Sequence, residues 1–437
     1  MKISVFGCGY LGAVHAACMA SLGHEVVGID IVPEQVRALS RGEAPFFEPD
    51  LPGLLAEGVA GGRLRFSVDP GDASPATVHF VCVNTPQKKG EYGADLSHLN
   101  AVIESILAVV KPGDVIVGKS TVPVGTAERL LARITAVEPE AELLWNPEFL
   151  REGHAVQDTL SPDRFVYGYV DGPQGRDAAA KLDEVYAVAL SDGVPKLETD
   201  LATAQLVKVA ANSFLATKIS FVNAMAELCE ATGADVTQLA DAIGYDDRIG
   251  RKFLNAGLGF GGGCLPKDIR AFMARAGELG VDQALTFLRE VDSINMRRRV
   301  RMVDLAREVC GGSIVGRRLA VLGSAFKPDS DDIRDSPALS VAAQMQLQGA
   351  RVLVTDPRAI DNARKKWPDL EFASTVEEAV AESEAVLLLT EWPEYVELDP
   401  ADLKRLVAVP RMIDGRNCLE PARWRAAGWT YRALGRP

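Results

Sequence analysis

The first third of the chain alternates short apolar runs with longer, helix-like segments. Strand-like runs occur at residues 2–7 (KISVFG), 25–30 (EVVGID), 78–83 (VHFVCV) and 114–120 (DVIVGKS). The segment YLGAVHAACMASLG, which follows the first run, has the pattern of a helix. Apolar strands that alternate with helices indicate a parallel sheet covered on both faces. We therefore expect an N-terminal α/β domain over residues 1–198.

The pattern changes in the middle of the chain. Residues 201–233 are rich in apolar side chains and contain no Gly or Pro before Gly233, which predicts one long helix. Such a helix often connects domains or forms a dimer interface, so we expect a central helical domain over residues 199–300. Strand-like runs then return as RLAVLGSAF, RVLVTD, AVLLLT and RMIDG. They predict a C-terminal α/β domain over residues 312–437.

Composition and charge narrow the possible partners. The chain has 437 residues, of which 47% are hydrophobic and 24% charged, as in ordinary globular proteins. Its net charge of −13 argues against DNA or an anionic membrane as the main partner, because both are negatively charged. A phosphate-bearing small molecule stays possible, since a few local cations and helix N-termini can bind one. Without a signal sequence or a long apolar run, the pattern favours a cytoplasmic protein.

The cysteines and histidines do not form a recognisable disulfide or metal pattern. There are seven cysteines with no C-x-x-C spacing, and the five histidines are scattered away from them. We therefore expect neither a disulfide framework nor a metal site. Most of the cysteines are expected to be small buried residues.

The segment GCGYLG has the spacing of a dinucleotide fingerprint. Gly7, Gly9 and Gly12 follow the first strand and open the first helix, and Asp30 ends the second strand. In this arrangement the glycines allow a tight turn, close approach of a pyrophosphate and close helix packing. A carboxylate at position 30 would bind the ribose hydroxyls and repel a 2′-phosphate, which favours NAD over NADP. The alternative is a tight turn without a ligand.

Two further stretches contain candidate polar groups. Ser120 and Thr121 follow a predicted strand, where ligands bind in open α/β folds, although they could equally cap the next helix. Glu148 and Glu152 are four residues apart and would share a face if this stretch were helical. They are either a functional pair or acidic residues favoured at a helix N-terminus.

Lys208 and Cys264 are the candidates for covalent and acid–base chemistry. Lys208 and Asn212 are one helical turn apart in an apolar stretch, so Lys208 either extends to solvent or needs a buried partner. A buried lysine there could stabilise an oxyanion. Cys264 lies in GFGGGCLPKD and could be a spacer, a metal ligand or a nucleophile. Nearby Lys267 and a predicted helix directly after Cys264 favour the thiolate and thus the nucleophile.

Taken together, these motifs resemble the UDP-glucose/GDP-mannose 6-dehydrogenase family over nearly the whole chain. The resemblance is carried, in order, by GCGYLG, VNTP, STVPVGT, NPEFLREG, KVAANSFLA, DDRIGRKFL, GFGGGCLPKD, FKPDSDDIRDSP and DGR. It implies an α/β fold of two Rossmann-like doubly wound domains, joined by a long central helix within a helical dimerisation region. It also implies the oxidation of a sugar C6 alcohol to a carboxylate with two NAD per turnover, through a thioester.

The resemblance assigns roles residue by residue. Cys264 would be the nucleophile, Lys208 would stabilise the oxyanion with help from Asn212, and Asp268 would handle protons through a water. Glu148, assisted by Thr121, would position or activate the hydrolytic water. NAD contacts would come from Gly7, Gly9, Tyr10, Leu11, Gly12, Asp30, Thr85, Ser120, Thr121, Glu152, Lys267 and Arg334. Substrate contacts would come from Glu148, Phe149, Leu150, Lys208, Asn212, Phe253, Asn255, Phe260, Gly261, Lys327 and Arg416, with Arg248 contributed across a homodimer.

The cysteine loop resembles the UDP-glucose branch of the family, so UDP-glucose is the expected substrate. GDP-mannose is the main alternative, and N-acetylated UDP-hexosamines fit the loop less well. A two-electron β-hydroxyacid dehydrogenase would not need Cys264, and a non-catalytic nucleotide-sugar-binding protein would be expected to lack Cys264 or Lys208. Three positions depart from the family pattern: Gln35 replaces a frequent basic residue, Gly263 a frequent serine, and His154 a smaller residue.

Overall fold

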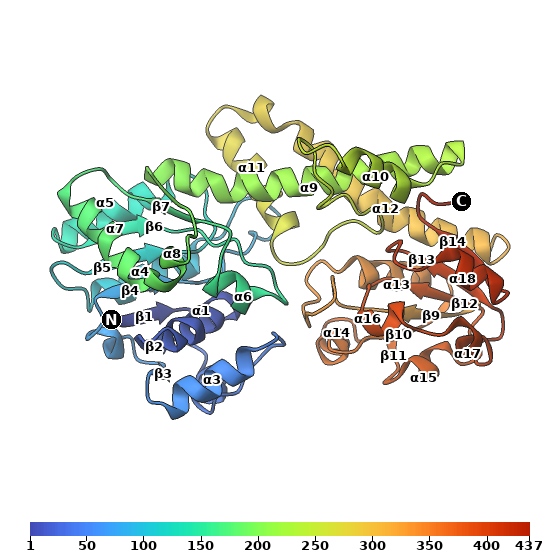
Figure 1. Ribbon diagram of the computed structural model, residues 1–437, viewed down its shortest axis with the longest axis horizontal. Helices are drawn as coiled ribbons and strands as arrows, with labels where there is room; N and C mark the ends of the chain where they lie inside the picture. Colours follow the sequence, from blue (N-terminus) through green and yellow to red (C-terminus); the bar gives the residue numbers. More distant parts are fainter. The chain divides into compact units, whose positions relative to one another are not determined.

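The structure is a computed structural model that describes residues 1–437, and it divides into two compact units. Unit 1 comprises Met1–Ala211 and Arg270–Gly280, and unit 2 comprises Asn212–Ile269 and Val281–Pro437. Two helices, α9 (Leu201–Thr232) and α11 (Leu265–Glu278), run from one unit into the other along the chain (Figure 1). No helix combines the length and the apolar character that crossing a bilayer would require.

Unit 1 is built on an eight-stranded sheet with the order β3-β2-β1-β4-β5-β6-β7-β8. All neighbours are parallel except β6 and β7, which pair antiparallel between Trp145 and Gly168. The first six strands thus have the Rossmann order 3-2-1-4-5-6, and two strands extend it. The strands are β1 (Lys2–Phe6), β2 (Glu25–Ile29), β3 (Leu64–Ser67), β4 (Val78–Val81), β5 (Val115–Gly118), β6 (Glu142–Trp145), β7 (Phe165–Gly168) and β8 (Lys196–Thr199).

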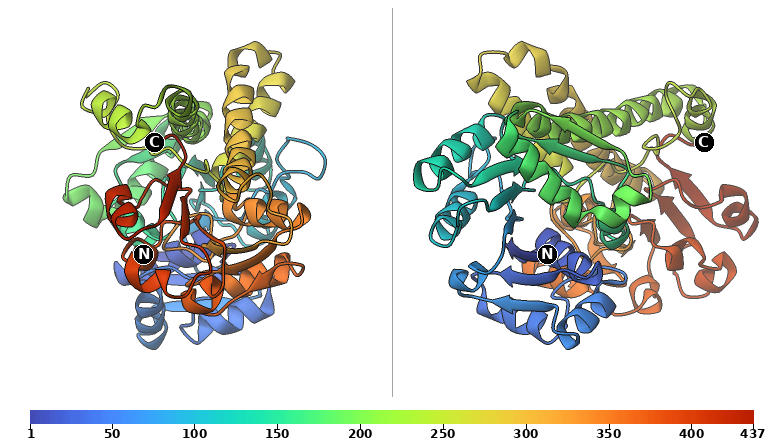
Figure 2. Two further views of the ribbon diagram at one scale, coloured as in Figure 1. Left: turned by 90° about the vertical axis from the view of Figure 1, so that its right-hand side faces the viewer. Right: turned by 60° about the vertical axis from the view of Figure 1, so that its left-hand side comes forward.

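Helices cover both faces of this sheet because its strands are apolar on both sides. Ile3 and Val5 of β1 belong to one buried cluster, which includes the helix residues Val14 and Leu55, whereas Phe6 belongs to the cluster on the other face. Figure 2 shows helices on both sides of each sheet. The remaining helices of unit 1 are α1 (Tyr10–Ser21), α2 (Pro33–Ser40), α3 (Leu51–Ala60), η1 (Pro70–Ala73), α4 (Ser97–Leu107), α5 (Thr126–Val137), α6 (Ala155–Leu160), α7 (Pro173–Val185) and α8 (Ala187–Ser191).

Unit 2 repeats the same strand order in a six-stranded parallel sheet, β11-β10-β9-β12-β13-β14. Its strands are β9 (Arg318–Leu322), β10 (Arg351–Thr355), β11 (Glu371–Phe372), β12 (Ala385–Leu388), β13 (Arg411–Asp414) and β14 (Thr430–Ala433). Its other helices are α10 (Val236–Gly244), η2 (Asp282–Leu285), α12 (Phe287–Val309), α13 (Pro337–Leu347), α14 (Ile360–Lys366), α15 (Val376–Val380), α16 (Pro393–Val396), α17 (Pro400–Lys404) and α18 (Pro421–Ala426).

The architecture confirms the predicted fold of two Rossmann-like sheets linked by a long helix. All eight strands that the apolar runs predict are present, and the predicted helix at 201–233 is α9 up to Thr232. The helix ends there because Gly233 adopts a left-handed backbone (φ 78°), which glycine tolerates without strain. The residues of α9 and α11 are divided between the two compact units.

Candidate functional site

The turn after β1 has the geometry that a dinucleotide fingerprint requires. A side chain at Gly12 would place its Cβ 1.8 Å from the carbonyl oxygen of Gly7, so only glycine lets α1 approach the strand. Around Gly9, by contrast, the nearest atom to an added Cβ is the amide of Asn84 at 4.0 Å, which leaves the backbone accessible. The turn therefore combines close packing at Gly12 with open space at Gly9, where a pyrophosphate would bind.

Asp30 lies at the end of β2 beside this turn and remains partly exposed. Its carboxylate accepts hydrogen bonds from the N–H groups of Cys8 at 2.7 Å and Val32 at 2.9 Å. The side-chain amide of Gln35 donates to the carbonyl of Cys8 and so helps to hold the turn. Arg37 lies on the surface of α2, 3.9 Å from Glu34. These residues fit NAD, because an acidic group at the end of β2 suits two free ribose hydroxyls.

Glu48 is a buried carboxylate that the sequence did not single out. It accepts hydrogen bonds from the backbone N–H groups of Gly153 and Ala155, both at 2.7 Å, and from the hydroxyl of Tyr10. Burial and this carboxylate raise the pKa of Tyr10 far above its ordinary value. Glu48 therefore ties the dinucleotide turn to the loop after β6, but no spacing in the sequence signalled this contact.

Ser120 and Thr121 lie at the carboxyl edge of the sheet and do not cap the next helix. The hydroxyl of Ser120 donates to the carbonyl of Val83 at 2.7 Å, and the hydroxyl of Thr85 donates to the carbonyl of Thr121 at 2.6 Å. The N-terminus of α5 is instead capped by the side-chain oxygen of Gln205, which accepts from the N–H groups of Thr126 and Ala127. The capping alternative is therefore wrong, and both residues lie at the edge of the sheet where ligands bind in open α/β folds.

Glu148 and Lys208 form a buried ion pair. Their charged atoms are 3.0 Å apart, and Lys208 is almost fully buried instead of extending to solvent. The Lys208 ammonium also lies 5.6 Å from the centre of the Phe149 ring. Residues 146–153 form a loop, so Glu148 and Glu152 do not share a helix face; α6 begins only at Ala155. The structure thus gives Lys208 the buried partner that the sequence left open.

A second lysine, Lys119, is buried beneath this loop. Its ammonium donates to the side-chain oxygen of Asn146 at 2.9 Å and to the hydroxyl of Tyr186 at 3.2 Å, and it lies near the Phe80 and Tyr186 rings. Burial lowers the pKa of Lys119 to about 8, and the charge of Glu148 partly opposes this shift. Lys119 and Asn146 therefore connect the two loops that carry Thr121 and Glu148.

In unit 2, Cys264 lies directly before α11, and its side chain is exposed. Its carbonyl accepts the first helical hydrogen bond from the N–H of Asp268 at 2.9 Å, so Cys264 is the N-cap residue. A thiol at a helix N-terminus is ionised more readily because the helix dipole stabilises the thiolate. The other free cysteines are buried or half-buried, which fits the expectation that they are structural.

Asn212, Asp268 and Lys267 form one hydrogen-bonded group. The amide of Asn212 donates to Asp268 at 2.7 Å, and the Lys267 ammonium donates to the other carboxylate oxygen at 2.6 Å. Asp268 is buried, and each of its carboxylate oxygens accepts one of these hydrogen bonds. Asn212 lies one turn after Lys208 on α9, which places the two candidate residues on the same side of one helix.

The glycines before Cys264 allow close contacts with the segment 326–337. An added Cβ would lie 2.8 Å from the Phe326 ring at Gly262, whose φ of 85° also disfavours other residues. At Gly263 it would lie 2.3 Å from the guanidinium of Arg334, which leaves no room for a side chain at this position. Arg334 is also bonded to Asp332 through two nitrogens, at 2.8 and 2.6 Å.

Arg416 connects several loops of unit 2. Its guanidinium donates to the carbonyls of Leu389 at 2.8 Å, Gly259 at 3.1 Å and Phe326 at 3.1 Å. Lys327, the other expected substrate contact here, lies next to Phe326 with its ammonium 5.7 Å from that ring. Arg416 thus holds the loops that carry Phe260 and Lys327.

Asp356 occupies in unit 2 the position that Asp30 occupies in unit 1, at the end of the strand that follows the first helix. It is buried, and its carboxylate accepts five N–H donors from Ser324, Ala325, Arg358, Ala359 and the indole of Trp392. The hydroxyl groups of a ribose would find no free acceptor on Asp356, because both of its carboxylate oxygens already accept hydrogen bonds.

Arg248 and Phe253 lie in an exposed loop. The Arg248 side chain is largely exposed and bonds only its neighbour Asp246, at 2.6 Å. Asn255 is exposed and accepts from Arg251 at 2.7 Å. The structure therefore leaves Arg248 able to reach another molecule.

Comparison with known proteins places this geometry in a family. The NAD-binding domain of the UDP-glucose/GDP-mannose dehydrogenase family matches residues 1–190, its central domain residues 202–297 and its UDP-binding domain residues 320–421. The chain belongs to this family. The predicted resemblance is thereby confirmed, and NAD-dependent dehydrogenase chemistry follows from it.

Members of the UDP-glucose/GDP-mannose dehydrogenase family match the chain over its full length. It is 42% identical to the UDP-glucose 6-dehydrogenase of Rhizobium meliloti, with 100% of both chains covered. It is 40% identical to the UDP-glucose 6-dehydrogenase TuaD of Bacillus subtilis, covering 100% of this chain and 93% of the relative. Among solved structures, a UDP-glucose dehydrogenase from Pyrobaculum islandicum is 37% identical with a TM-score of 0.89, covering 100% and 98% of the two chains.

Proposed function

We propose that the protein oxidises the C6 alcohol of UDP-glucose to the carboxylate of UDP-glucuronate, with two NAD per turnover. Relatives that match the whole chain are named UDP-glucose 6-dehydrogenases. The observation that carries the proposal is the exposed thiol of Cys264 at the N-terminus of α11. A two-electron dehydrogenase would not need this thiol, and a binding protein would need neither it nor the buried Lys208.

Bound NAD would accept a hydride in each of the two oxidations, and in the first the proton of the C6 hydroxyl would leave through a water held by Asp268 and Lys208. After the first, the Cys264 sulfur would add to the aldehyde carbon, and the thiol proton would leave through a water held by Asp268 and Lys208. The Lys208 ammonium would stabilise the negative oxygen of the adduct, and Asn212 would hold Asp268 in place. The second oxidation would convert this adduct to a thioester on Cys264.

Hydrolysis of the thioester would release the product. A water would attack the acyl carbon, the C–S bond would break, and the thiolate of Cys264 would be restored. Glu148 would accept the proton of that water, because its carboxylate lies 3.0 Å from Lys208 and its loop is joined to the loop of Thr121 by the hydrogen bond from Lys119 to Asn146. The Glu148–Lys208 ion pair would thus serve both the oxyanion and the water.

The substrate and the stoichiometry are tested together by counting NADH per sugar. We expect two NADH per UDP-glucose and little turnover of GDP-mannose, the main alternative substrate. Cys264→Ser should bind NAD normally but form no sugar acid. Normal acid formation by this variant would rule out the thioester route, and faster turnover of GDP-mannose would reassign the substrate.

We also propose that the protein is a homodimer through α9. Phe214, Phe221 and Leu228 recur at seven-residue intervals on this helix and are 66%, 49% and 58% exposed. Three large apolar side chains on one helix stripe need a partner, and a second copy would supply an identical stripe. Arg248 in its exposed loop could then reach the substrate bound by the partner copy.

A further inference from the structure

The loop that leads to Cys264 is buried although it contains neither helix nor strand. Residues 256–262, here called the 256–262 loop, are all buried, whereas Cys264 two residues later is exposed. Buried backbone N–H and C=O groups must find hydrogen-bond partners, and this loop cannot find them in a regular ladder. Its shape therefore depends on the side chains that bind its backbone.

Asn295 of α12 binds both polar groups of one loop residue. Its side-chain oxygen accepts the N–H of Phe260 at 2.7 Å, and its side-chain nitrogen donates to the carbonyl of the same residue at 2.9 Å. Asn295 is 1% exposed, so water does not compete for these bonds. An added Cβ at Gly259 would lie 2.1 Å from the Asn295 oxygen, and Gly259 has a φ of 86°. The glycine leaves the space that the amide fills.

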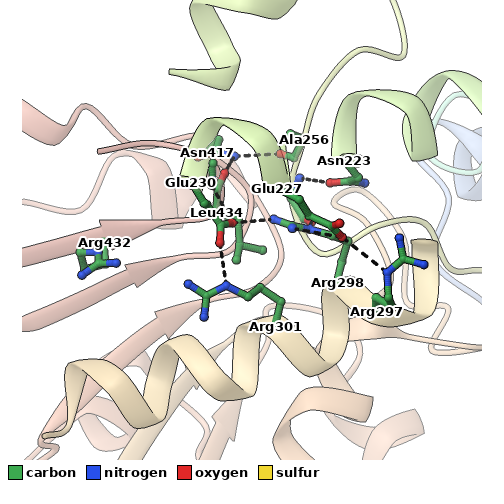
Figure 3. A network of polar contacts seen from close by, with 12 residues as sticks. Asn223, Glu227, Glu230, Ala256, Arg297, Arg298, Arg301, Asn417, Arg432 and Leu434 are labelled. Atoms are coloured by element: carbon green, nitrogen blue, oxygen red, sulfur yellow. Dashed lines mark hydrogen bonds and ion pairs between the residues drawn. The ribbon is translucent and has the colours of Figure 1, made fainter. Parts of the chain in front are cut away.

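A second pair of side chains binds the loop three residues earlier. Asn223 of α9 accepts the N–H of Gly257 at 2.9 Å, and Arg298 of α12 donates to its carbonyl at 3.3 Å. Figure 3 shows how Arg298 is held in turn by Glu230, at 3.1 Å. Residues of α9 and α12 thus bind the loop at Gly257 and Phe260, and the C-terminal segment binds it between these points, through Gly415 to the N–H of Leu258 and through Arg416 to the carbonyl of Gly259.

The contacts at Phe260 affect the position of the Cys264 thiol because only a short segment of chain separates the two residues. Only three residues separate Phe260 from Cys264, and one of them, Gly262, is bound through its N–H to the carbonyl of Arg334 at 2.8 Å. A shift of Phe260 must therefore be taken up by Gly261 and Gly263 or passed on to Cys264. We infer that Asn295 is a positioning residue that sets the place of the Cys264 sulfur through the backbone of Phe260.

The inference rests on the proposed function and makes a distinct prediction about its two oxidations. The first oxidation does not need the thiol, whereas trapping of the aldehyde does. If Asn295 is lost, the thiol should be misplaced, the aldehyde should escape and acid formation should fall. A residue that merely stabilised the fold would lower both oxidations equally.

The test compares Asn295→Leu, which keeps the volume but no hydrogen bond, with Asn295→Asp, which keeps the acceptor for the Phe260 N–H. Asn100→Ala, a polar residue of α4 bonded to Arg133, is the control. Hydroxylamine in the reaction traps free aldehyde as an oxime and converts thioester to a hydroxamate, so the oxime is counted by mass spectrometry against the sum of hydroxamate and sugar acid, here called the acid. Hydrogen exchange is measured in parallel on the peptide covering residues 256–263 and on β9.

For Asn295→Leu we expect acid formation to fall by roughly 10- to 100-fold, because two buried hydrogen bonds are lost. The oxime-to-acid ratio should rise, exchange should quicken only in the 256–263 peptide, and Asn295→Asp should lie between parent and Leu variant. An unchanged oxime-to-acid ratio, or unchanged loop exchange, would overturn the inference. If the parent protein forms no NADH from UDP-glucose, the proposed function fails instead, and the exchange of the loop still tests the contact.

Discussion

Lys119 shows how a single buried charge can matter for two loops at once. Both hydrogen-bond partners of its ammonium, Asn146 and Tyr186, are uncharged, so the charge is poorly compensated. Burial lowers the pKa of Lys119 from its ordinary value of 10.5 to about 8. Below pH 8 the folded state therefore holds a proton that burial disfavours.

This shift predicts a pH dependence of stability. Between pH 8 and 10.5 the unfolded chain keeps the Lys119 proton while the folded chain has lost it, so stability from this group rises with pH. Relative to Lys119→Met, the parent protein should gain about 3 kcal/mol of unfolding free energy across this window. Urea unfolding of both proteins at pH 7 and pH 10 measures the difference, because other titrating groups cancel. An equal gap at both pH values would contradict the buried charge.

Glu148 is predicted to be needed for hydrolysis rather than for oxidation. In Glu148→Gln the amide cannot accept the proton of the attacking water, so the rate of acid release should fall by about 100-fold or more. A covalent sugar adduct should accumulate on the peptide that contains Cys264, as seen by mass spectrometry. Glu91→Gln, on an exposed loop, is the matched control. Absence of an adduct in Glu148→Gln would reject this role.

The individual motifs were predictable, but their pairing was not. Lys208 and Glu148 were each marked by an unusual setting, yet 60 residues separate them and no local pattern links them. Glu48, Lys119 and Asn295 carried no signal in a single sequence, because their importance comes from neighbours that only the fold provides. Gln205 illustrates the opposite case: it took the capping role that the local sequence offered to Ser120.

At the scale of elements, α9 is the part of the chain with the clearest double role. Its inner side contributes Lys208 and Asn212, and its outer stripe of Phe214, Phe221 and Leu228 is exposed. Good helix formers and the absence of Gly and Pro explain why it continues over 32 residues.

The outer stripe makes the dimer testable. In Phe221→Asp two charges would be buried at a symmetric contact, which should raise the dissociation constant by at least about 100-fold. Light scattering across a dilution series should find a monomer where the parent protein is a dimer. Leu347→Asp places the same charge on an exposed apolar residue of α13 and should leave the mass unchanged. A dimeric Phe221→Asp protein would exclude α9 as the interface.

Except for β11, which has two residues, length does not separate the strands that were predicted from those that were missed. The missed strands β3, β6, β7, β8 and β14 have four residues each, as do the predicted strands β4, β5, β12 and β13. The strands β3, β8 and β14 carry polar side chains at exposed positions, which interrupt the apolar run. The antiparallel step from β6 to β7 also had no signal, since strand direction depends on the connection and not on composition. The loop at 146–153 lies at this step.

At the scale of the whole molecule, two sheets of the same order differ in one carboxylate. Asp30 is partly exposed with two backbone donors, whereas the oxygens of buried Asp356 already serve five. We therefore expect one NAD per chain, measured by equilibrium dialysis or calorimetry. Asp30→Ala should weaken NAD binding by about 10-fold or more through lost ribose hydrogen bonds. A stoichiometry of two would show that unit 2 also binds the dinucleotide.

The occupied oxygens of Asp356 also bear on the timing of catalysis. With a single binding site for the dinucleotide, NADH would have to dissociate and a second NAD would have to bind between the two oxidations of each cycle. During that exchange the reactive aldehyde would stay in the site, and its covalent bond to the Cys264 sulfur would keep it from diffusing away. The need for a covalent anchor at Cys264 would then follow from the inability of the second sheet to host a dinucleotide of its own.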